Sequence, residues 1–157
     1  MTTLNDLSDE DLLTACLWAE ARGEIEDGQK AVCNVILNRV AKGMKLTIRN
    51  VILQPHQFSW TESGDVNLAK VFTAWEEKPD AWVRANRIAK AAIDKELVDN
   101  TKNADHYLNV KATRAARGNG TLPSWYDETK VTVVIGKHTF LNLLGTKKKN
   151  TVTNSIG

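Results

Sequence analysis

The chain has 157 residues, of which 42% are hydrophobic and 25% are charged. This length and composition are typical of one soluble globular domain that builds a single core without disulfides or metal ions. The formal net charge of +2 gives no strong positive field, so the composition does not indicate nucleic-acid binding. No apolar run is long enough to predict insertion into a membrane.

The cysteines and the N-terminus exclude further classes of protein. Cys16 and Cys33 lie in helical patterns and neither has a CxxC partner, so we expect buried, reduced thiols. A disulfide between them is the alternative. Residues 1–7 contain neither a basic leader nor a hydrophobic core, so the sequence predicts no signal peptide.

The first predicted helix places an acidic residue on its apolar face. It begins after Ser8, a suitable N-cap, and apolar side chains at helical spacing lead to Glu20. Gly23 is predicted to end this helix, so Glu20 lies in the last turn, where the helix dipole disfavours negative charge. Partial burial acts in the same direction, so we expect a raised pKa for Glu20. Such an acid is a candidate proton donor; alternatively, Glu20 reaches solvent or pairs with Arg22 or Arg39.

The middle of the chain is predicted to be mostly helical. We expect a helix from the cap residue Asp27 to near Gly43, followed by a short apolar piece at 51–53 and an irregular aromatic loop at 55–64. After this loop we expect a short helix at 66–75 and a longer helix that begins at Pro79 and Asp80 and continues to 93.

The pattern changes to short strands after residue 100. We expect a strand at 104–110, a glycine-containing loop at 117–123, and a hairpin formed by 131–135 and 138–143. Helices first and antiparallel strands later predict an α+β domain with a small antiparallel sheet beside a helical body. Residues 1–145 form this domain, and residues 146–157 are expected to be a polar, flexible tail.

Several motifs resemble the SleB-like cell-wall hydrolases, the family of the spore-cortex-lytic enzyme, whose catalytic domain also serves as a phage endolysin. The motifs are Trp18 to Glu24, Gly28-Gln29, Ala31-Val32, Val35, Asn38-Arg39, Gln57 to Trp60, and Ile135-Gly136 with His138 and Phe140. The family commonly has tyrosine-glycine before the glutamate, where this chain has Trp18 and Ala19. That departure concerns the shape of the sugar site and not the acid.

The resemblance implies a lysozyme-like helical body and the activity of a lytic transglycosylase on peptidoglycan. In that reaction one glutamic acid protonates the bond between N-acetylmuramic acid and N-acetylglucosamine, and the 6-hydroxyl of the same sugar then attacks to give a 1,6-anhydro product. A second carboxylate is not needed because the nucleophile is tethered. We assign the acid to Glu20. Glu24 is one turn further on and would stack beside it, so we interpret Glu24 as a supporting residue.

The remaining candidate residues would bind substrate or support the site. Loop and strand-end aromatics can line a sugar groove, and amides can bind acetamido groups or tie loops together. For each aromatic, core packing is the alternative, and for His138 we favour a structural hydrogen bond over proton transfer. These candidates are Asn38, Arg39, Gln57, Phe58, Trp60, Tyr107, Trp125 and His138.

Other chemistries fit the sequence less well. His56, His106 and His138 lack the spacing of zinc ligands, and we expect no metal or other cofactor. The remaining alternatives are a muramidase or an amidase on the same fold, or a non-catalytic wall-binding or virion protein. We expect a monomer that acts on peptidoglycan strands. A phage endolysin without a signal peptide would be made in the host cytoplasm and reach the wall after release.

Overall fold

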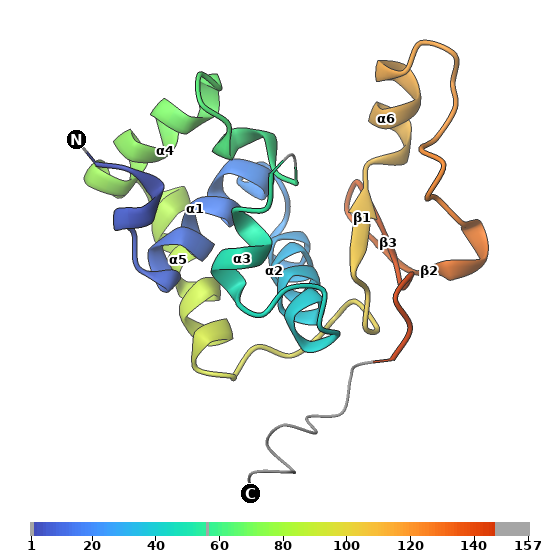
Figure 1. Cartoon of the computed structure of the whole chain (residues 1–157), viewed down its shortest axis with the longest axis horizontal. Coiled ribbons are helices and arrows are strands. Elements are labelled where there is room, and N and C mark those ends of the chain that lie inside the picture. Colours follow the sequence, from blue (N-terminus) through green and yellow to red (C-terminus); the bar gives the residue numbers. More distant parts are fainter. Residues whose placement is uncertain (1, 56, 147–157) are drawn as a thin grey trace, which may run out of the picture.

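The computed structural model describes residues 2–55 and 57–146, and it has two parts (Figure 1). A helical body contains the first five α-helices, and a smaller lobe contains the sheet and the sixth helix. The helices are α1 (Asp9–Ala21), α2 (Glu26–Ala41), α3 (Ile48–Ile52), α4 (Val66–Glu77), α5 (Asp80–Ile93) and α6 (Val110–Ala116). Short 3₁₀ turns lie at Leu4–Asp6, Ser59–Thr61 and Glu128–Lys130. The predicted α+β class, with a small sheet beside a helical body, is confirmed.

The helix α1 lies at the centre of the helical body. Ser8 caps it as predicted, because its Oγ accepts a hydrogen bond of 3.1 Å from the N–H of Asp11. Every side chain from Leu12 to Trp18 is buried, since α1 packs against α2, α3, α4 and α5. A helix buried on nearly all sides needs no polar face. It ends at Ala21 with Arg22 as C-cap, slightly before the predicted stop at Gly23.

The helix α2 separates two hydrophobic cores. Val32 and Ile36 face the large core of the helical body. Ala31 and Val35, on another face of the same helix, pack with Phe140 of the sheet. The sheet is therefore attached to the helical body through one side of α2.

The sheet has three antiparallel strands in the order β1-β3-β2. The strands are β1 (His106–Leu108), β2 (Val131–Ile135) and β3 (His138–Leu141). Tyr107 lies opposite Phe140 in the β1–β3 pair. The predicted β2–β3 hairpin is confirmed, and Gly136 in its turn has a φ of +59°, which a residue without a side chain adopts most easily.

Some predicted boundaries were wrong. The second helix begins at Glu26 with Ile25 in the N-cap position, so Asp27 lies in the first turn and does not cap it. The apolar piece at 51–53 belongs mostly to α3, which Thr47 caps. The strand predicted at 104–110 is limited to β1, because the side chain of Asn109 accepts from the N–H of Ala112 and starts α6, a helix that the sequence did not predict.

The predictions about the C-terminal tail and about membrane insertion are tested only for the residues that the structure describes. Residues 147–157 of the predicted tail lie outside the described residues. Within the described ranges, no helix combines the length and apolar character that a membrane crossing requires.

A buried ion pair joins the end of α2 to the start of β1. The Nζ of Lys42 lies 2.7 Å from Oδ2 of Asp105, and both side chains are almost completely shielded from solvent. Asp105 also accepts from the N–H groups of Leu143 and Leu144 and from His106 Nδ1. Burial would raise the pKa of Asp105, but these hydrogen bonds hold it well below the usual range of an aspartate.

We expect Asp105→Asn to lower the free energy of unfolding at pH 7 by about 3–5 kcal/mol, because it leaves Lys42 buried without its counter-ion. The native pKa is lowered, so the stabilisation is present at neutral pH and is lost as the pH falls through that lowered value. Urea denaturation at several pH values measures the difference. The exposed Lys90–Asp94 pair supplies the control, since Asp94→Asn should cause little change. Equal midpoints for Asp105→Asn and wild type would contradict the expectation.

Candidate active site

Glu20 lies where the helical body meets the sheet. It is half-buried in the last turn of α1, at the end of the stretch whose side chains fill the large core. Burial raises the pKa of Glu20 above the usual value of a glutamate, while Tyr107 and Arg39 oppose the shift. The predicted direction of the pKa shift therefore agrees with the structure.

Tyr107 of β1 makes the direct contact between the two parts at this point. Its hydroxyl donates a hydrogen bond of 2.7 Å to Oε1 of Glu20. Burial and the nearby Glu20 raise the pKa of Tyr107 well above its usual value, so the hydroxyl keeps its proton and stays a donor. Because one carboxyl oxygen is occupied in this way, the other, Oε2, is the atom that can pass a proton to a ligand.

Arg39 of α2 supplies positive charge beside this pair. Its Nε donates to the backbone carbonyl of Asp105 at 2.7 Å, and its Nη1 is buried without a hydrogen-bond partner among the described residues. Burial lowers the pKa of Arg39, and Tyr107 and Glu20 are among the groups that oppose this shift. Arg39 thus favours the carboxylate form of Glu20 by its charge without forming an ion pair with it.

The structure does not support the alternative in which Glu20 forms an ion pair with an arginine. Salt bridges among the described residues include none from Glu20 to Arg22 or Arg39. The guanidinium of Arg22 instead lies 4.1 Å from the centre of the Trp18 ring and donates to the Trp18 carbonyl at 3.0 Å. The same nitrogen, Nη1, also donates to the carbonyl of Ala19 at 3.3 Å, one of the last carbonyls of α1, which have no partner within the helix.

Glu24 contacts the tip of the β2–β3 hairpin. Its Oε1 accepts from the backbone N–H of Lys137 at 3.4 Å, and a Cβ on Gly136 would lie 3.1 Å from the same oxygen. The donor to Glu24 is thus a backbone N–H group of the hairpin. Glu24 therefore holds the hairpin close to the helical body.

His138 lies between Glu24 and Tyr107. Its Nδ1 is 3.5 Å from Oε1 of Glu24, and its ring meets the Tyr107 ring edge-on at 5.1 Å. Burial lowers the pKa of His138, with Glu24 opposing, so the imidazole is neutral at neutral pH. The structural hydrogen bond that we favoured is absent at Nδ1, which is buried without a hydrogen-bond partner in the described part of the chain.

Asn38, Phe58 and Trp60, three of the other predicted residues, have structural roles. Asn38 donates to the carbonyl of Ala104 at 2.8 Å and to Asp99 at 3.1 Å, which ties α2 to the segment before β1. Phe58 and Trp60 are 3% and 1% exposed and belong to the large core, so the core-packing alternative holds for both and neither side chain is exposed enough to line a sugar groove. Gln57 is half-buried at the start of this loop.

Trp125 lies on the wrong face of the sheet to share a site with Tyr107. It is 39% exposed and packs on the ring of His106 at 5.2 Å. His106 and Tyr107 are successive residues of β1, so their side chains point to opposite faces. The face on which Trp125 packs could not be predicted from the sequence, because the pattern did not show which residues of this short strand face the helical body.

Both cysteines are free and buried, as expected. Burial raises the pKa of Cys33 to about 12 and that of Cys16 well above its usual value, so neither thiol forms a nucleophilic thiolate.

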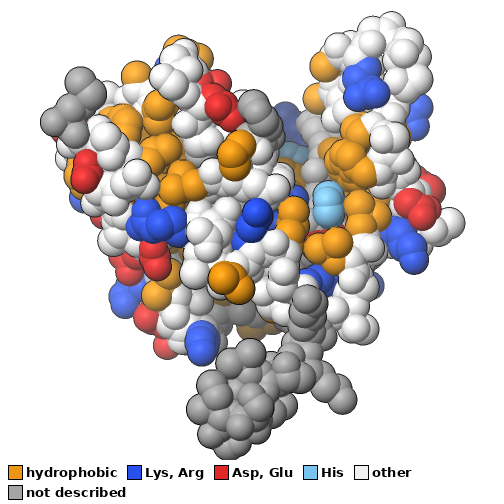
Figure 2. All heavy atoms as spheres, in the orientation of Figure 1, with side chains coloured by type: hydrophobic (Ala, Val, Ile, Leu, Met, Phe, Trp, Pro, Cys, Tyr) orange, Lys and Arg blue, Asp and Glu red, His pale blue; other side chains and the backbone are white. Residues whose placement is uncertain are grey.

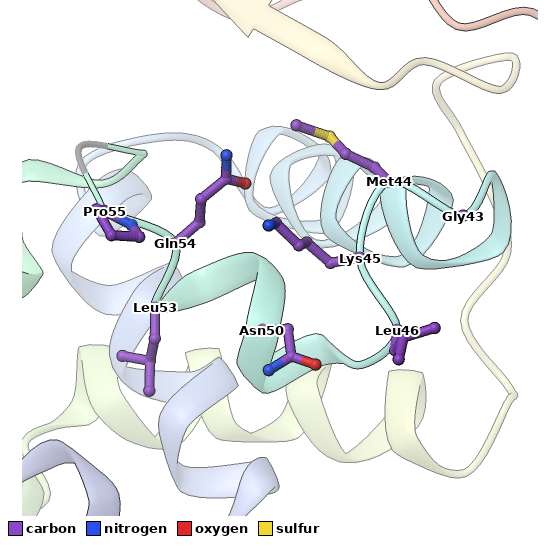
Figure 3. Close-up of a pocket in the computed structure, with 8 residues that line it drawn as sticks. All are labelled: Gly43, Met44, Lys45, Leu46, Asn50, Leu53, Gln54 and Pro55. Atoms are coloured by element: carbon purple, nitrogen blue, oxygen red, sulfur yellow. The ribbon is translucent and has the colours of Figure 1, made fainter.

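The surface is hollowed between the helical body and the sheet lobe (Figure 2). The Glu20–Tyr107 contact lies at the junction of these same two parts. A different hollow of about 480 Å³ lies between the end of α2 and α3, where the side chains of Lys45 and Gln54 extend toward each other (Figure 3). None of the predicted site residues lines it. This hollow is therefore not part of the candidate site around Glu20.

Sequence reasoning missed Lys42 and Asp105, which position β1 and hence Tyr107. A signal for Lys42 was present, because Ala31, Val35, Asn38 and Lys42 repeat at the spacing of one helix face. No comparable local signal marked Asp105. Among residues 2–55 and 57–146, no group of three or more metal-binding side chains occurs.

Comparisons with known proteins agree with this fold. The family model described as Cell Wall Hydrolase matches residues 23–141, a segment that begins just after Glu20. The catalytic domain of the germination-specific lytic transglycosylase SleB from Bacillus anthracis is 28% identical, with a TM-score of 0.60 over 88% of this chain and 98% of that one. The catalytic domain of the Bacillus cereus SleB protein is also 28% identical, with a TM-score of 0.57 over 85% and 89% of the two chains. No curated protein sequence matches this chain.

The fold and the family match therefore define an enzyme that degrades cell walls. The chain belongs to the cell-wall hydrolase family. The resemblance noted from the sequence is confirmed.

The pKa of Glu20 provides a test of the site that does not depend on activity. We expect the Glu20 carboxyl, followed by carbon-detected NMR, to titrate above the usual glutamate range because of its burial. Tyr107→Phe should raise that pKa further, since it removes the hydrogen bond that favours the carboxylate. Tyr126→Phe is the matched control, because Tyr126 bonds to Glu128 on the exposed loop. An unchanged Glu20 titration in Tyr107→Phe would show that the hydrogen bond does not act on this acid.

Proposed function

We propose that this enzyme is a peptidoglycan lytic transglycosylase in which Glu20 acts first as acid and then as base. The observation that carries the proposal is the environment of Glu20, in which burial favours the protonated form while Tyr107 and Arg39 favour the carboxylate. Opposing influences of this kind make the free-energy difference between the two forms smaller than burial alone would make it. A residue that must give a proton and take one back in the same turnover needs that balance.

The first step breaks the bond between N-acetylmuramic acid and N-acetylglucosamine. The protonated Oε2 of Glu20 donates to the glycosidic oxygen, the C1–O bond breaks, and the N-acetylglucosamine leaves with the proton as its new hydroxyl. Glu20 becomes a carboxylate, which the hydroxyl of Tyr107 and the charge of Arg39 stabilise. Donors that are already in place cost no rearrangement when the charge develops.

The second step closes the anhydro ring. The 6-hydroxyl of the N-acetylmuramic acid attacks C1 of its own ring and gives its proton to the Glu20 carboxylate. Because the nucleophile is part of the substrate, proximity replaces an enzyme-bound water and its base. The product is 1,6-anhydro-N-acetylmuramic acid, and Glu20 returns to its protonated form.

The position of Glu24 favours this route over hydrolysis. A muramidase uses a second carboxylate across the scissile bond as nucleophile or base. Glu24 is the nearest acidic residue along the chain, yet its Oε1 faces the hairpin at Lys137 and His138. The structural similarity to the domain named as a lytic transglycosylase in Bacillus anthracis supports the same conclusion.

We expect wild-type protein to release muropeptides that are lighter than hydrolysis products by the mass of one water, as measured by mass spectrometry of digested peptidoglycan. Glu20→Gln should reduce the rate by at least about a hundredfold, because an amide cannot supply the proton. Its circular dichroism and unfolding midpoint should match those of wild type. Products with a new reducing end would instead identify a muramidase, and full activity of Glu20→Gln would remove the assignment of Glu20.

The pH dependence follows from the same acid. The reaction needs protonated Glu20, so kcat/KM should fall as the pH rises through its pKa, which burial places above the usual glutamate range. Tyr107→Phe should move this alkaline limb to higher pH while lowering kcat, since the carboxylate form loses a stabilising hydrogen bond. Initial rates on solubilised glycan strands between pH 4 and 9 measure both effects. An alkaline limb that stays in place would contradict the assigned role of Tyr107.

A further inference from the structure

The helix α6 has no buried residue, and the loop that follows it to residue 127 has none either. It projects from the end of β1 at the far side of the sheet lobe (Figure 1). A helix that buries nothing within its own chain gains little stability from packing. Its exposed surface is therefore available to a ligand.

The surface of this helix is positively charged. Residues 106–126 contain no aspartate or glutamate but include Lys111, Arg114 and Arg117. Figure 2 shows basic and no acidic side chains over the part of the lobe that carries α6. Arg114 and Arg117 hydrogen-bond to the following loop, at Gly120 and Thr121.

A hollow of about 520 Å³ lies between α6 and the tip of the β2–β3 hairpin. Apolar atoms make up most of its lining surface, and two lysines lie at it. The lining residues are Asn109, Val110, Lys111, Ala112, Ala115, Lys137 and Thr139. Lys111 and Lys137 are exposed, and among the described residues neither ammonium group forms an ion pair. Two unpaired cations over an apolar floor suit a ligand that has both carboxylates and short alkyl groups.

The hollow and the proposed reaction centre share the tip of the β2–β3 hairpin. Thr139, which lines the hollow, follows His138, whose ring contacts Tyr107, the residue that binds Glu20. Successive strand residues point to opposite faces, so the hollow lies across β3 from this contact. The N–H of Lys137 also bonds to Glu24 of the helical body. The tip of the hairpin thus connects the hollow to the junction where the glycan would be cut.

We propose that this hollow binds the peptide stem of peptidoglycan, with Lys111 and Lys137 pairing with free carboxylates of the stem. The inference rests on the proposed function. The stem is attached through the lactyl group at C3 of the N-acetylmuramic acid whose C1 reacts, so the stem must leave the sugar close to Glu20. Its alanine methyl groups match the apolar floor of the hollow, and its carboxylates match the two lysines.

The test compares glycan strands that keep their stems with strands from which an amidase has removed them. The double variant Lys111→Ala/Lys137→Ala should raise KM for stem-bearing strands by about threefold to tenfold, as expected for two solvent-exposed ion pairs, with kcat unchanged. Its KM for stem-free strands should equal that of wild type. The control Lys70→Ala/Lys90→Ala removes the same charge from exposed positions of α4 and α5 and should change neither value.

A binding measurement separates this inference from the proposed function. The Glu20→Gln protein, with and without the two lysine substitutions, is titrated with both kinds of strand by calorimetry. Weaker binding of the lysine variant to stem-bearing strands alone supports the stem site, even if wild type proves not to cut glycan. Equal loss on both kinds of strand, or no loss on either, would overturn it.

Discussion

The buried contact between Lys42 and Asp105 is the constraint on which the arrangement of the two parts depends. The same lysine also bonds to Asn103 and Asn142, so one ammonium group holds the chain just before β1 and just after β3. Arg39, one turn earlier on α2, holds the backbone of Asp105. Two residues beyond Asp105 is Tyr107, and its hydroxyl reaches Glu20 only because this start of β1 is held against α2.

The acidity of Glu20 follows from where α1 ends. The helix is buried on nearly all sides until Trp18, so the next acidic side chain emerges at the edge of the core with little access to water. The hydrogen bond from Tyr107 and the charge of Arg39 lower the pKa of Glu20 and so partly offset the effect of burial. Because Tyr107 comes from β1 and Arg39 from α2, the properties of this acid belong to the assembled protein and not to α1 alone.

The sequence predicted those features that depend on local pattern. Ser8, the apolar run of α1 and the raised pKa of Glu20 followed from helical spacing and from the end of one helix. The helix α6 was missed because its residues lack an apolar stripe and because Asn109 caps it through a single side-chain bond. Phe58 and Trp125 were candidate sugar contacts that the structure does not place at the site, for a different reason. Whether an aromatic side chain in a loop faces the core, the site or the far side of a short strand depends on tertiary packing, which spacing alone does not contain.

The contacts that complete the site join residues far apart in the chain, and this has a consequence for biosynthesis. Glu20 and Tyr107 are 87 positions apart, and Lys42 and Asn142 are 100 apart. The five helices of the body come before the sheet in the chain and are neighbours in sequence, whereas β3, the central strand, is made after both β1 and β2. A nascent chain therefore has its acidic side chain long before β1 and β3 are present to complete the contacts around it.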